Sequence, residues 1–499
     1  MRAAYLVGMD VRFAKIVAKV APANGHSTFE LRGIPAKHAR ELRIRVMSAL
    51  QSVGVALDDY QIIVDRMMAG EAEYVPNDAP IDLAIAMAVL GEFGTVPKDA
   101  IDRYIFIGEL SLSGVLRPVR GLLPLVLGCF RRAPELEVFV PRCQAREAMP
   151  LGALRHAETL ESTIAFFRSG KSYPTYPDHT ESETFEQEID LSDVRGLHSA
   201  KRAMEIAAAG GHNLLLIGSP GTGKTMLARR FPTILPELNR EQEIESTSIH
   251  SIAGLLQPNQ YTISKPPFRA PHHTVSATGL IGGGDPVRPG EASLAHNGVL
   301  YLDELFEFRR TVLGSLKPVF ETKKAEIVRS GIRYEYPADC IVIGSVNPCP
   351  CGFHGDKSRR CECTPNRIDT YAHRFRDPLF NRFPIRARTS NTGVLEKPSC
   401  SSGEVQARVV KAREIQKARC EKLGIEFVVN DRLSAKHFAR VAPLPDAALR
   451  IIEDASARHR LSARDQESII KVSRTIADLD ESESIEARHV SEAICLRVG

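Results

Sequence analysis

The sequence predicts an α/β protein of several domains, with a parallel-sheet core in the middle and a helical segment at the end. Three observations carry this prediction. The 499 residues are too many for one hydrophobic core, and ~150 residues per domain suggests about three domains. Within residues 191–389, short apolar runs alternate with helical patterns, which is typical of a parallel sheet with helices on both faces. From residue 404 to residue 499 the pattern is nearly all helical.

The composition is that of a folded globular protein without a dominant charge. Hydrophobic residues make up 43% and charged residues 25% of the chain, and the net charge is +4. Any contact with nucleic acid must therefore come from local basic patches. Tryptophan is absent and aromatic residues are 6%, so a stacking platform for bases is not expected. No run of ~18 apolar residues and no signal-peptide layout occurs, which predicts no membrane span and a cytoplasmic protein with reduced cysteines.

Two polar stretches divide the chain. Residues 171–190 combine prolines with many acids and have no apolar period, so they read as a linker. Residues 390–403 are polar and rich in serine, and they read as a connector. The predicted parts are therefore a first domain at 1–170, a core at 191–389 and a helical lid at 404–499.

The first domain mixes element types, which predicts an α+β or α/β fold. Residues 14–20 alternate like a strand, and residues 36–53 and 81–90 have helical patterns. Residues 104–108 and 138–140 are short apolar runs of the kind found in buried strands.

The core and the lid show clearer patterns. Three apolar runs in the core each precede a loop: 213–217, 299–302 and 341–345. Ligands of parallel sheets lie beyond the carboxyl ends of such strands. Helical periodicity in the lid is clearest at 405–422, 464–479 and 486–496.

One motif after the first core strand predicts a nucleotide site. The P-loop pattern is matched in full by Gly218, Ser219, Pro220, Gly221, Thr222, Gly223, Lys224 and Thr225. Glycines let successive backbone N–H groups point at phosphate oxygens, and the helix N-terminus adds partial positive charge. We expect Lys224 to reach the β and γ phosphates of ATP and Thr225 to coordinate Mg²⁺. The alternative, a chance Gly-rich turn, is disfavoured by the flanking strand and helix.

Polar residues that end the other two core strands fit the same chemistry. Asp303 follows the run 299–302, where it can hold Mg²⁺, and Glu304 can then polarise the attacking water as general base. Asn347 follows the next strand, where it can orient that water. The alternative for Asn347 is a cap on the turn before Pro348, and the sequence leaves both open.

The segments 208–218, 268–274, 282–284 and 289–305 resemble the ComM/YifB family of magnesium-chelatase-like AAA+ ATPases, and the resemblance extends over nearly the whole chain. It implies a homo-hexameric ring with each ATP site at a subunit boundary, and Asn347 as a sensor. It also implies that Arg382 is a trans-acting arginine finger and Arg464 a second sensor from the lid. The family usually has Asp where this chain has Asn381 and Pro384. The alternative for Arg382 is a surface arginine near a domain boundary without a catalytic role.

The resemblance also implies a Lon-protease-like first domain. Residues 108–122 are similar to the Lon segment that presents the catalytic lysine, and residues 76–80 to the loop before its serine. The serine position falls on Ile81 and the lysine position on Leu125, neither of which can act as nucleophile or base. The prediction is a scaffold or partner surface without peptidase activity.

Cys349, Cys351, Cys361 and Cys363 flank a short polar loop and could hold Zn²⁺. Their C-x-C spacing is tighter than the usual C-x₂-C, and four reduced thiols on an exposed loop are the alternative. Two adjacent histidines, His272 and His273, are further candidate metal ligands. Neighbours on a strand point to opposite faces, so we expect no shared ion there.

Basic residues precede the strand that ends at Asn347. Lys323, Lys324, Arg329 and Arg333 lie in a stretch that alternates like a hairpin, where related ring helicases carry a pore insertion. Such cations would contact DNA phosphates, whereas a solvated hairpin is the alternative. The family resemblance implies a DNA branch-migration helicase linked to natural transformation. Two other classes stay open: a chelatase-type motor that remodels a protein, which the Lon-like domain argues against, and a non-enzymatic scaffold, which the intact P-loop argues against.

Overall fold

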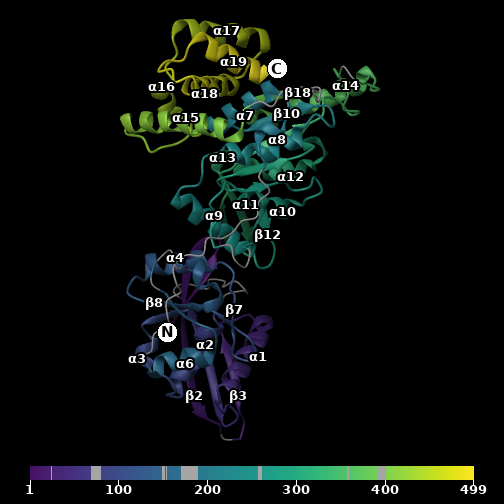
Figure 1. The fold of residues 1–499 in the computed structure, drawn as a ribbon. Helices are drawn as coiled ribbons and strands as arrows, with labels where there is room; N and C mark the ends of the chain where they lie inside the picture. Colours follow the sequence, from purple (N-terminus) through teal and green to yellow (C-terminus); the bar gives the residue numbers. More distant parts are fainter. Residues whose placement is uncertain are drawn as a thin grey trace.

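A computed structural model of the chain describes residues 1–23, 25–68, 80–148, 152, 154–169, 189–256, 261–356, 359–390 and 400–498. Figure 1 shows three parts stacked along one axis: the first segment at the bottom, a sheet-based core in the middle and a group of helices at the top. Of the predicted linker at 171–190 only residues 189 and 190 are described, and residues 391–399 of the predicted connector at 390–403 lie outside the described residues. The same holds for the loop at 76–80, of which Pro80 alone is described.

The first segment is built on a mixed seven-stranded sheet with the order β3-β4-β2-β1-β5-β8-β9. Its strands are β1 (Arg2–Val7), β2 (Asp10–Pro22), β3 (Thr28–Arg32), β4 (Tyr60–Met68), β5 (Tyr104–Phe106), β8 (Glu137–Pro141) and β9 (Arg155–Ala157), with β6 (Glu109–Leu110) and β7 (Leu116–Arg117) as a separate ribbon. Its helices are α1 (Ala36–Ser52), α2 (Asp82–Glu92), α3 (Lys98–Ile101), α4 (Leu122–Arg132), α5 (Ala145–Ala148) and α6 (Leu160–Ser169). The five predicted elements of this segment are confirmed. Helix α2 is buried on all sides, because its sequence is apolar all round.

The core holds a five-stranded parallel sheet with the order β11-β14-β17-β10-β18. The strands are β10 (Leu214–Gly218), β11 (Phe268–Arg269), β14 (Val299–Leu302), β17 (Ile341–Val346) and β18 (Ile385–Thr389). The prediction of a parallel sheet is confirmed. Strand β17 lies between β10 and β14, so the loops that follow these three strands meet at one edge of the sheet.

Both faces of this sheet are covered, as the alternation of its side chains requires. Leu214 and Leu216 belong to a hydrophobic cluster shared with the C-terminal helices, whereas Leu215 joins a cluster on the opposite face. The core helices are α7 (His198–Gly210), α8 (Lys224–Arg230), α9 (Arg240–Ala253), α10 (Ala277–Ile281), α11 (Glu291–Leu294), α12 (Arg310–Ser315), α13 (Lys317–Thr322) and α14 (Pro365–Ala372). Two antiparallel ribbons complete it: β12 (Gly282–Gly283) with β13 (Arg288–Pro289), and β15 (Lys324–Arg329) with β16 (Ile332–Pro337).

The C-terminal part is helical, as predicted: α15 (Ser402–Lys422), α16 (Ala435–Val441), α17 (Asp446–His459), α18 (Ala463–Leu479) and α19 (Ala487–Val498). Helix α15 begins inside the stretch predicted as connector. It does so because Ser401 and Glu404 form a capping box that satisfies the first N–H groups of the helix. Helices α15 and α18 pack against α7, and α17 and α19 contribute residues to the same hydrophobic cluster.

The first segment is joined to the core by packing as well as by the chain. Tyr5, Val7 and Ala14 belong to the same hydrophobic cluster as the face of the sheet that carries Leu215. The backbone N–H of Gly121 donates to the carbonyl of Ser251 in α9 at 3.1 Å. Figure 1 shows α4 directly beneath the end of the core that holds α9 and β12. Along the described residues, no helix combines the length and the apolar character that a membrane crossing requires.

Candidate nucleotide-binding site

The P-loop connects the carboxyl end of β10 to the N-terminus of α8. Gly223 is the residue before α8 and has a φ of 87°, a left-handed conformation that favours glycine. The Lys224 side chain is buried and turned back over the loop. Its Nζ donates to the carbonyls of Gly218 at 2.5 Å and Ser219 at 2.9 Å, and to Asn347 Oδ1 at 3.2 Å. The lysine therefore lies between the P-loop and the end of β17.

Burial is the main influence on the charge of Lys224. It lowers the pKa of the ammonium below its usual value, and the carboxylates of Asp303 and Glu304 oppose this shift in part. A cation that has lost water gains more from an anionic partner than an exposed cation does. The site is thus prepared for a polyphosphate, whose oxygens can replace the neutral carbonyls that now accept from Nζ.

Asp303, at the end of β14, is held by three hydroxyl groups. Its Oδ2 accepts from Thr225 Oγ1 at 3.1 Å, and its Oδ1 accepts from Tyr301 at 2.8 Å and from Ser345 at 2.5 Å. A carboxylate beside a hydroxyl is a hard oxygen donor set of the kind that Mg²⁺ binds, so Thr225 and Asp303 fit the ion. Tyr301 and Ser345 were missed in the sequence. Tyr301 lies two residues before Asp303, and Ser345 lies two residues before Asn347. Because residues i and i+2 share a strand face, this spacing could have indicated both contacts.

The backbone conformation of Glu304 sets the direction of its side chain, which is not held by contacts with buried residues. It has a φ of 51°, and its N–H donates to Ser345 Oγ at 2.9 Å. Its side chain is 56% exposed, with Oε2 at 4.0 Å from His273 Nδ1. A solvent-facing carboxylate next to Thr225 and Asp303, the groups that fit Mg²⁺, is suited to contact a water molecule.

The two histidines are arranged differently from the expectation. They follow β11 in a turn, and their rings face each other with centroids 4.1 Å apart, so the assumption of a strand with opposed side chains was wrong. The chain leaves the sheet after Arg269, and strand alternation no longer applies. The groups able to hold a metal among the described residues do not include these histidines.

The P-loop is also tied to β18, the edge strand beside β10. Thr222 Oγ1 lies 2.8 Å from Thr389 Oγ1, and Thr389 ends β18. A Cβ on Gly218 would come within 2.1 Å of that Thr389 hydroxyl, so only glycine fits at Gly218. Thr389 is a second contact that the sequence did not indicate.

Arg382 lies at the opposite edge of the sheet from the P-loop. It precedes β18, whose start pairs with the start of β10, and its carbonyl accepts from Asn213 Nδ2 at 3.0 Å. Its guanidinium pairs with Glu321. A cleft of about 530 Å³ adjoins it, with lining residues that include Arg310, Lys317, Arg374, Phe306 and Phe380. The cleft is rich in cations, and Arg382 forms part of its wall.

Arg464 lies near the same edge as Arg382. Its neighbour Asp465 pairs with Arg497, and Arg497 donates to the carbonyl of Phe383 at 2.6 Å. The start of α18 is therefore beside the start of β18. Five strand residues at ~3.3 Å each separate this edge from the P-loop edge, which is ~16 Å. Within one chain, neither Arg382 nor Arg464 lies with Lys224 and Asp303.

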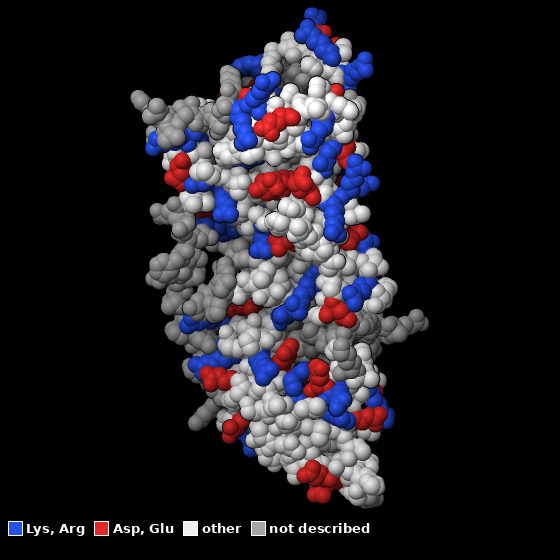
Figure 2. All heavy atoms as spheres, turned by 90° about the vertical axis from the view of Figure 1, so that its right-hand side faces the viewer, with Lys and Arg blue, Asp and Glu red and all other residues white. Residues whose placement is uncertain are grey.

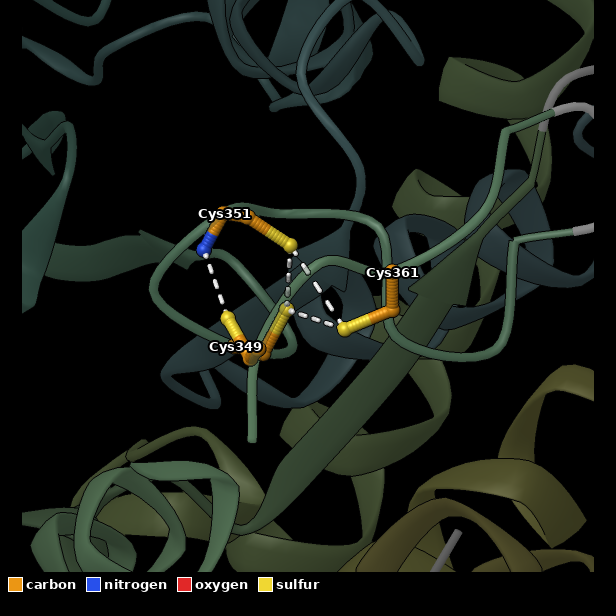
Figure 3. Close-up of side chains that lie close together, drawn as sticks. Cys349, Cys351 and Cys361 are labelled. Carbon is orange, nitrogen blue, oxygen red and sulfur yellow. Dashed lines mark hydrogen bonds between the residues drawn. The ribbon is translucent and has the colours of Figure 1, made fainter. Parts of the chain in front are cut away.

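The four predicted zinc ligands converge. The Sγ atoms of Cys349, Cys351, Cys361 and Cys363 all lie within 4.8 Å of one another, and Figure 3 shows three of these side chains pointing to a common centre. The tight C-x-C spacing therefore does not keep the four sulfurs apart. None of the ten cysteines is in a disulfide.

The predicted basic hairpin exists as β15 and β16, but its cations are paired. Lys324 lies 3.0 Å from Glu335, Arg333 lies 2.8 Å from Glu326, and Arg329 lies 3.5 Å from Asp285. Lys323 precedes the hairpin, in the turn after α13, and burial together with the nearby charge of Arg432 lowers the pKa of its ammonium. Lys323 has a left-handed backbone and lies one residue before β15, so it adjoins the hairpin and is not part of its strands.

Comparison with known proteins adds the family. Residues 190–396 match the family model for magnesium chelatase, subunit ChlI, and residues 399–497 match the model for its C-terminal part. Residues 18–143 match a third model, subunit ChlI of Mg-chelatase. The chain is 34% identical to the competence protein ComM of Haemophilus influenzae over 98% of this chain and 96% of that protein. The chain belongs to the ComM/YifB family of magnesium-chelatase-like AAA+ ATPases.

Two further relatives show how far the similarity extends. The uncharacterized protein YifB of Escherichia coli is 34% identical over 98% of this chain and 95% of its own length. The magnesium-chelatase 67 kDa subunit of Chlorobaculum parvum is 28% identical, over 32% of this chain and 23% of its own length. Members of this AAA+ group bind and hydrolyse ATP with Mg²⁺, and the ComM/YifB relatives match this chain end to end, whereas the chelatase subunit matches a part.

Proposed function

We propose that this AAA+ ATPase works as a homo-hexameric ring that hydrolyses Mg-ATP to move DNA, as a branch-migration helicase in DNA processing linked to natural transformation or recombination. One observation supports the ATP site above all others. Lys224, Thr225, Asp303 and Asn347, from three different strand ends, lie within direct hydrogen-bonding reach at one edge of the sheet. This is the edge where ligands of parallel sheets bind.

The roles of the residues follow from their positions. The P-loop amides from Gly218 to Gly223 would cradle the phosphates, and Lys224 would neutralise their charge. Thr225 and Asp303 would hold Mg²⁺, which supplies further charge neutralisation between the β and γ phosphates when bound. Glu304 would accept a proton from the attacking water as general base, and Asn347 would orient that water.

Arg382 and Arg464 would act on the ATP of a neighbouring copy. Both lie at the edge remote from their own P-loop, so neither can reach that site without a large rearrangement. A ring that closes head to tail joins two different surfaces of neighbouring copies, and we propose that this edge of one copy meets the P-loop edge of the next. Arg382 would then exchange Glu321 for the γ-phosphoryl group and stabilise the charge that develops there. Asn381 and Pro384, which replace the usual acids, would alter how tightly the copies are coupled.

The similarity to a competence protein supports DNA as the substrate. The surface charges support it less, because positive and negative side chains are mixed. Figure 2 shows Lys and Arg interspersed with Asp and Glu among the described residues of one face. Exposed ion pairs like that of Lys324 with Glu335 contribute ~0–1 kcal/mol, so a phosphate can displace the carboxylate at small cost. We therefore propose that Lys324, Arg329 and Arg333, together with Lys323 directly before them, contact DNA phosphates inside the ring.

The first segment is proposed to have a Lon-protease-like fold without peptidase activity. Leu125 and Pro80, the residue before Ile81, line one cavity of about 40 Å³ between this segment and the core. Leucine and isoleucine offer neither nucleophile nor base, so a partner surface or scaffold is the role we propose. The cytoplasmic location stays a prediction from the sequence.

A chelatase-type motor that remodels a protein partner is the second candidate. The observation that favours it is the match of residues 18–143 to a model named for a magnesium-chelatase subunit. Because of this match, the presence of the first segment does not count against a relationship to chelatase subunits. We put the DNA motor first because the similarity to ComM covers 98% of this chain.

The deciding experiment measures the rate of ATP hydrolysis by the full-length protein alone, with single-stranded DNA and with branched DNA. Stimulation by DNA that weakens with added salt, and that disappears in Lys224→Ala, is the expected result. Arg329→Ala should reduce the stimulation, and Lys19→Ala, which removes an exposed charge from β2, serves as the matched control. Turnover that is indifferent to DNA would favour the protein-remodelling motor, and no turnover would refute the motor.

A further inference from the structure

The cysteine cluster has the dimensions of a tetrahedral metal site. Three of its sulfur–sulfur distances are 3.3, 3.5 and 3.7 Å. Four sulfurs at ~2.3 Å from a zinc ion would be ~3.8 Å apart, whereas a disulfide would bring two of them to ~2.05 Å. The observed distances fit four ligands around one ion, after a small outward movement, and fit no disulfide.

Two backbone amides point at the sulfurs. The N–H of Cys351 donates to Cys363 Sγ at 3.4 Å, and the N–H of His354 donates to Cys349 Sγ at 3.2 Å. Amide donors stabilise thiolates over thiols, and they commonly surround metal-bound sulfur. The backbone of the loop is thus arranged for negatively charged sulfur.

The loop has little else to hold it in shape. Among its described residues between Asn347 and Thr364, Cys349 is the one buried hydrophobic residue. Phe353 lies under the guanidinium of Arg359, at 4.3 Å from its ring centroid, and is not fully buried. A segment without its own core needs a cross-link to keep one conformation, and a bound ion provides one.

The same loop rests on the nucleotide site. Gly352, next to Cys351, has a φ of 87°, and a Cβ there would come within 2.5 Å of Pro220 Cδ. The same Cβ would lie 3.9 Å from Asn347 Cγ. The loop therefore touches both the P-loop and Asn347, and its shape sets the space available to each.

We propose that Cys349, Cys351, Cys361 and Cys363 bind one structural zinc ion, and that this ion holds Gly352 against Pro220 so that the P-loop keeps its nucleotide-binding shape. The zinc takes no part in hydrolysis. The second half of the proposal rests on the assignment of the P-loop as the ATP site, and it is independent of whether DNA is the substrate.

Metal content tests the site itself. Full-length protein grown with zinc should contain about one zinc per chain, and Co²⁺ exchanged into it should show the absorption of tetrahedral thiolate coordination. Cys361→Ser with Cys363→Ser should lose the metal. Cys143→Ser with Cys495→Ser, two exposed cysteines outside the cluster, should retain it. Wild-type protein without zinc, or equal zinc in both double variants, would overturn the site.

Binding of a fluorescent ATP analogue tests the connection to the P-loop. Removing zinc with a chelator should weaken binding by about tenfold, the lower end of the range for changes around a metal site. Gly352→Ala should keep its zinc and weaken binding, because its Cβ displaces Pro220. Gly355→Ala is the matched control, since it has a φ of 80° in the same loop and nothing within 4 Å of its Cβ.

Either of two results would refute the connection: unchanged affinity after zinc removal, or equal affinity in the two glycine variants. Because binding and not turnover is measured, a protein that binds zinc and nucleotide but ignores DNA would refute the DNA motor and leave the zinc site standing.

Discussion

Ser345 is the residue on which the two acids of the ATP site depend. Its hydroxyl donates to Asp303 Oδ1 at 2.5 Å and accepts from the N–H of Glu304 at 2.9 Å. The side chain is fully buried. It therefore sets the orientation of the carboxylate that would hold Mg²⁺ and the left-handed turn that presents Glu304.

Replacing Ser345 with alanine should lower kcat for ATP hydrolysis by about 10–100-fold, as loss of a partner of a metal ligand usually does. The KM for ATP should change much less, because Lys224 and the P-loop amides are untouched. Steady-state kinetics would measure both. Ser315→Ala is the control, since that hydroxyl donates to a carbonyl of its own helix. A variant with wild-type kcat would show that Ser345 does not position Asp303.

At the scale of elements, the start of β18 and the start of α18 form one edge that carries both catalytic arginine candidates. Asp465 and Arg497 tie α18 to the Phe383 carbonyl, which keeps Arg464 near the segment of Arg382. Helix α18 cannot bring Arg464 over its own P-loop while these contacts persist. The arrangement requires a neighbouring copy if the arginines are to act.

Mixing two inactive variants tests this arrangement. Lys224→Ala lacks a working ATP site but keeps Arg464, whereas Arg464→Ala keeps the site but lacks the arginine. If Arg464 serves the neighbouring site, mixed rings should recover ATP hydrolysis well above either variant, because some interfaces combine an intact site with an intact arginine. Mixing Lys224→Ala with Glu304→Gln should recover nothing, as both act in their own site. Absence of recovery in the first mixture would place Arg464 in its own site.

At the scale of the whole molecule, a charged network joins the lid to the core. His212, after α7, contacts Asp431 of the lid at 3.2 Å and Thr475 of α18 at 2.8 Å. Arg432 of the lid pairs with Asp339 of the core at 2.7 Å. Burial by itself raises the pKa of Asp431, but Arg432, His212 and Lys323 lower it more, so the net shift is below the usual value of 3.8.

The depressed pKa of Asp431 has a defined consequence for stability. Because the folded pKa lies below the unfolded one, the stabilisation is present above about pH 4 and is lost as the pH falls toward the folded pKa. Asp431→Asn should reduce stability by about 2 kcal/mol at pH 7, since Arg432 and His212 lose a charged partner. The variant should then lose less than the wild type on acidification.

Thermal unfolding measured between about pH 3 and pH 7 tests this prediction. Asp454→Asn, an exposed acid on α17, is the control and should follow the wild type. Parallel pH curves for wild type and Asp431→Asn would show that another group carries the acid sensitivity.

The features that could be predicted from the sequence are local ones. The P-loop is eight consecutive residues. The strands β10, β14 and β17 can be predicted from apolar runs, and those of β14 and β17 are followed directly by a polar residue. The capping box at Ser462 and Asp465 marks the start of α18 in the same way. Hydrophobic periodicity and turn chemistry depend on near neighbours in the chain, so they can be recognised from the sequence without a structure.

The contacts between distant residues that position the groups of the site cannot be predicted from the sequence in this way. Ser345 and Asp303 are 42 residues apart, and Gly352 meets Pro220 from a loop that the sequence shows only as polar. The position of Arg464 depends on how α18 packs against α19 and α19 against β18, because a motif identifies the residue but not the edge of the sheet that it faces. Packing of distant elements sets these distances, and several packings are compatible with one pattern of periodicity. The residues proposed to bind and hydrolyse ATP could therefore be identified from the sequence, whereas the separation of Arg382 and Arg464 from their own P-loop comes from the folded arrangement.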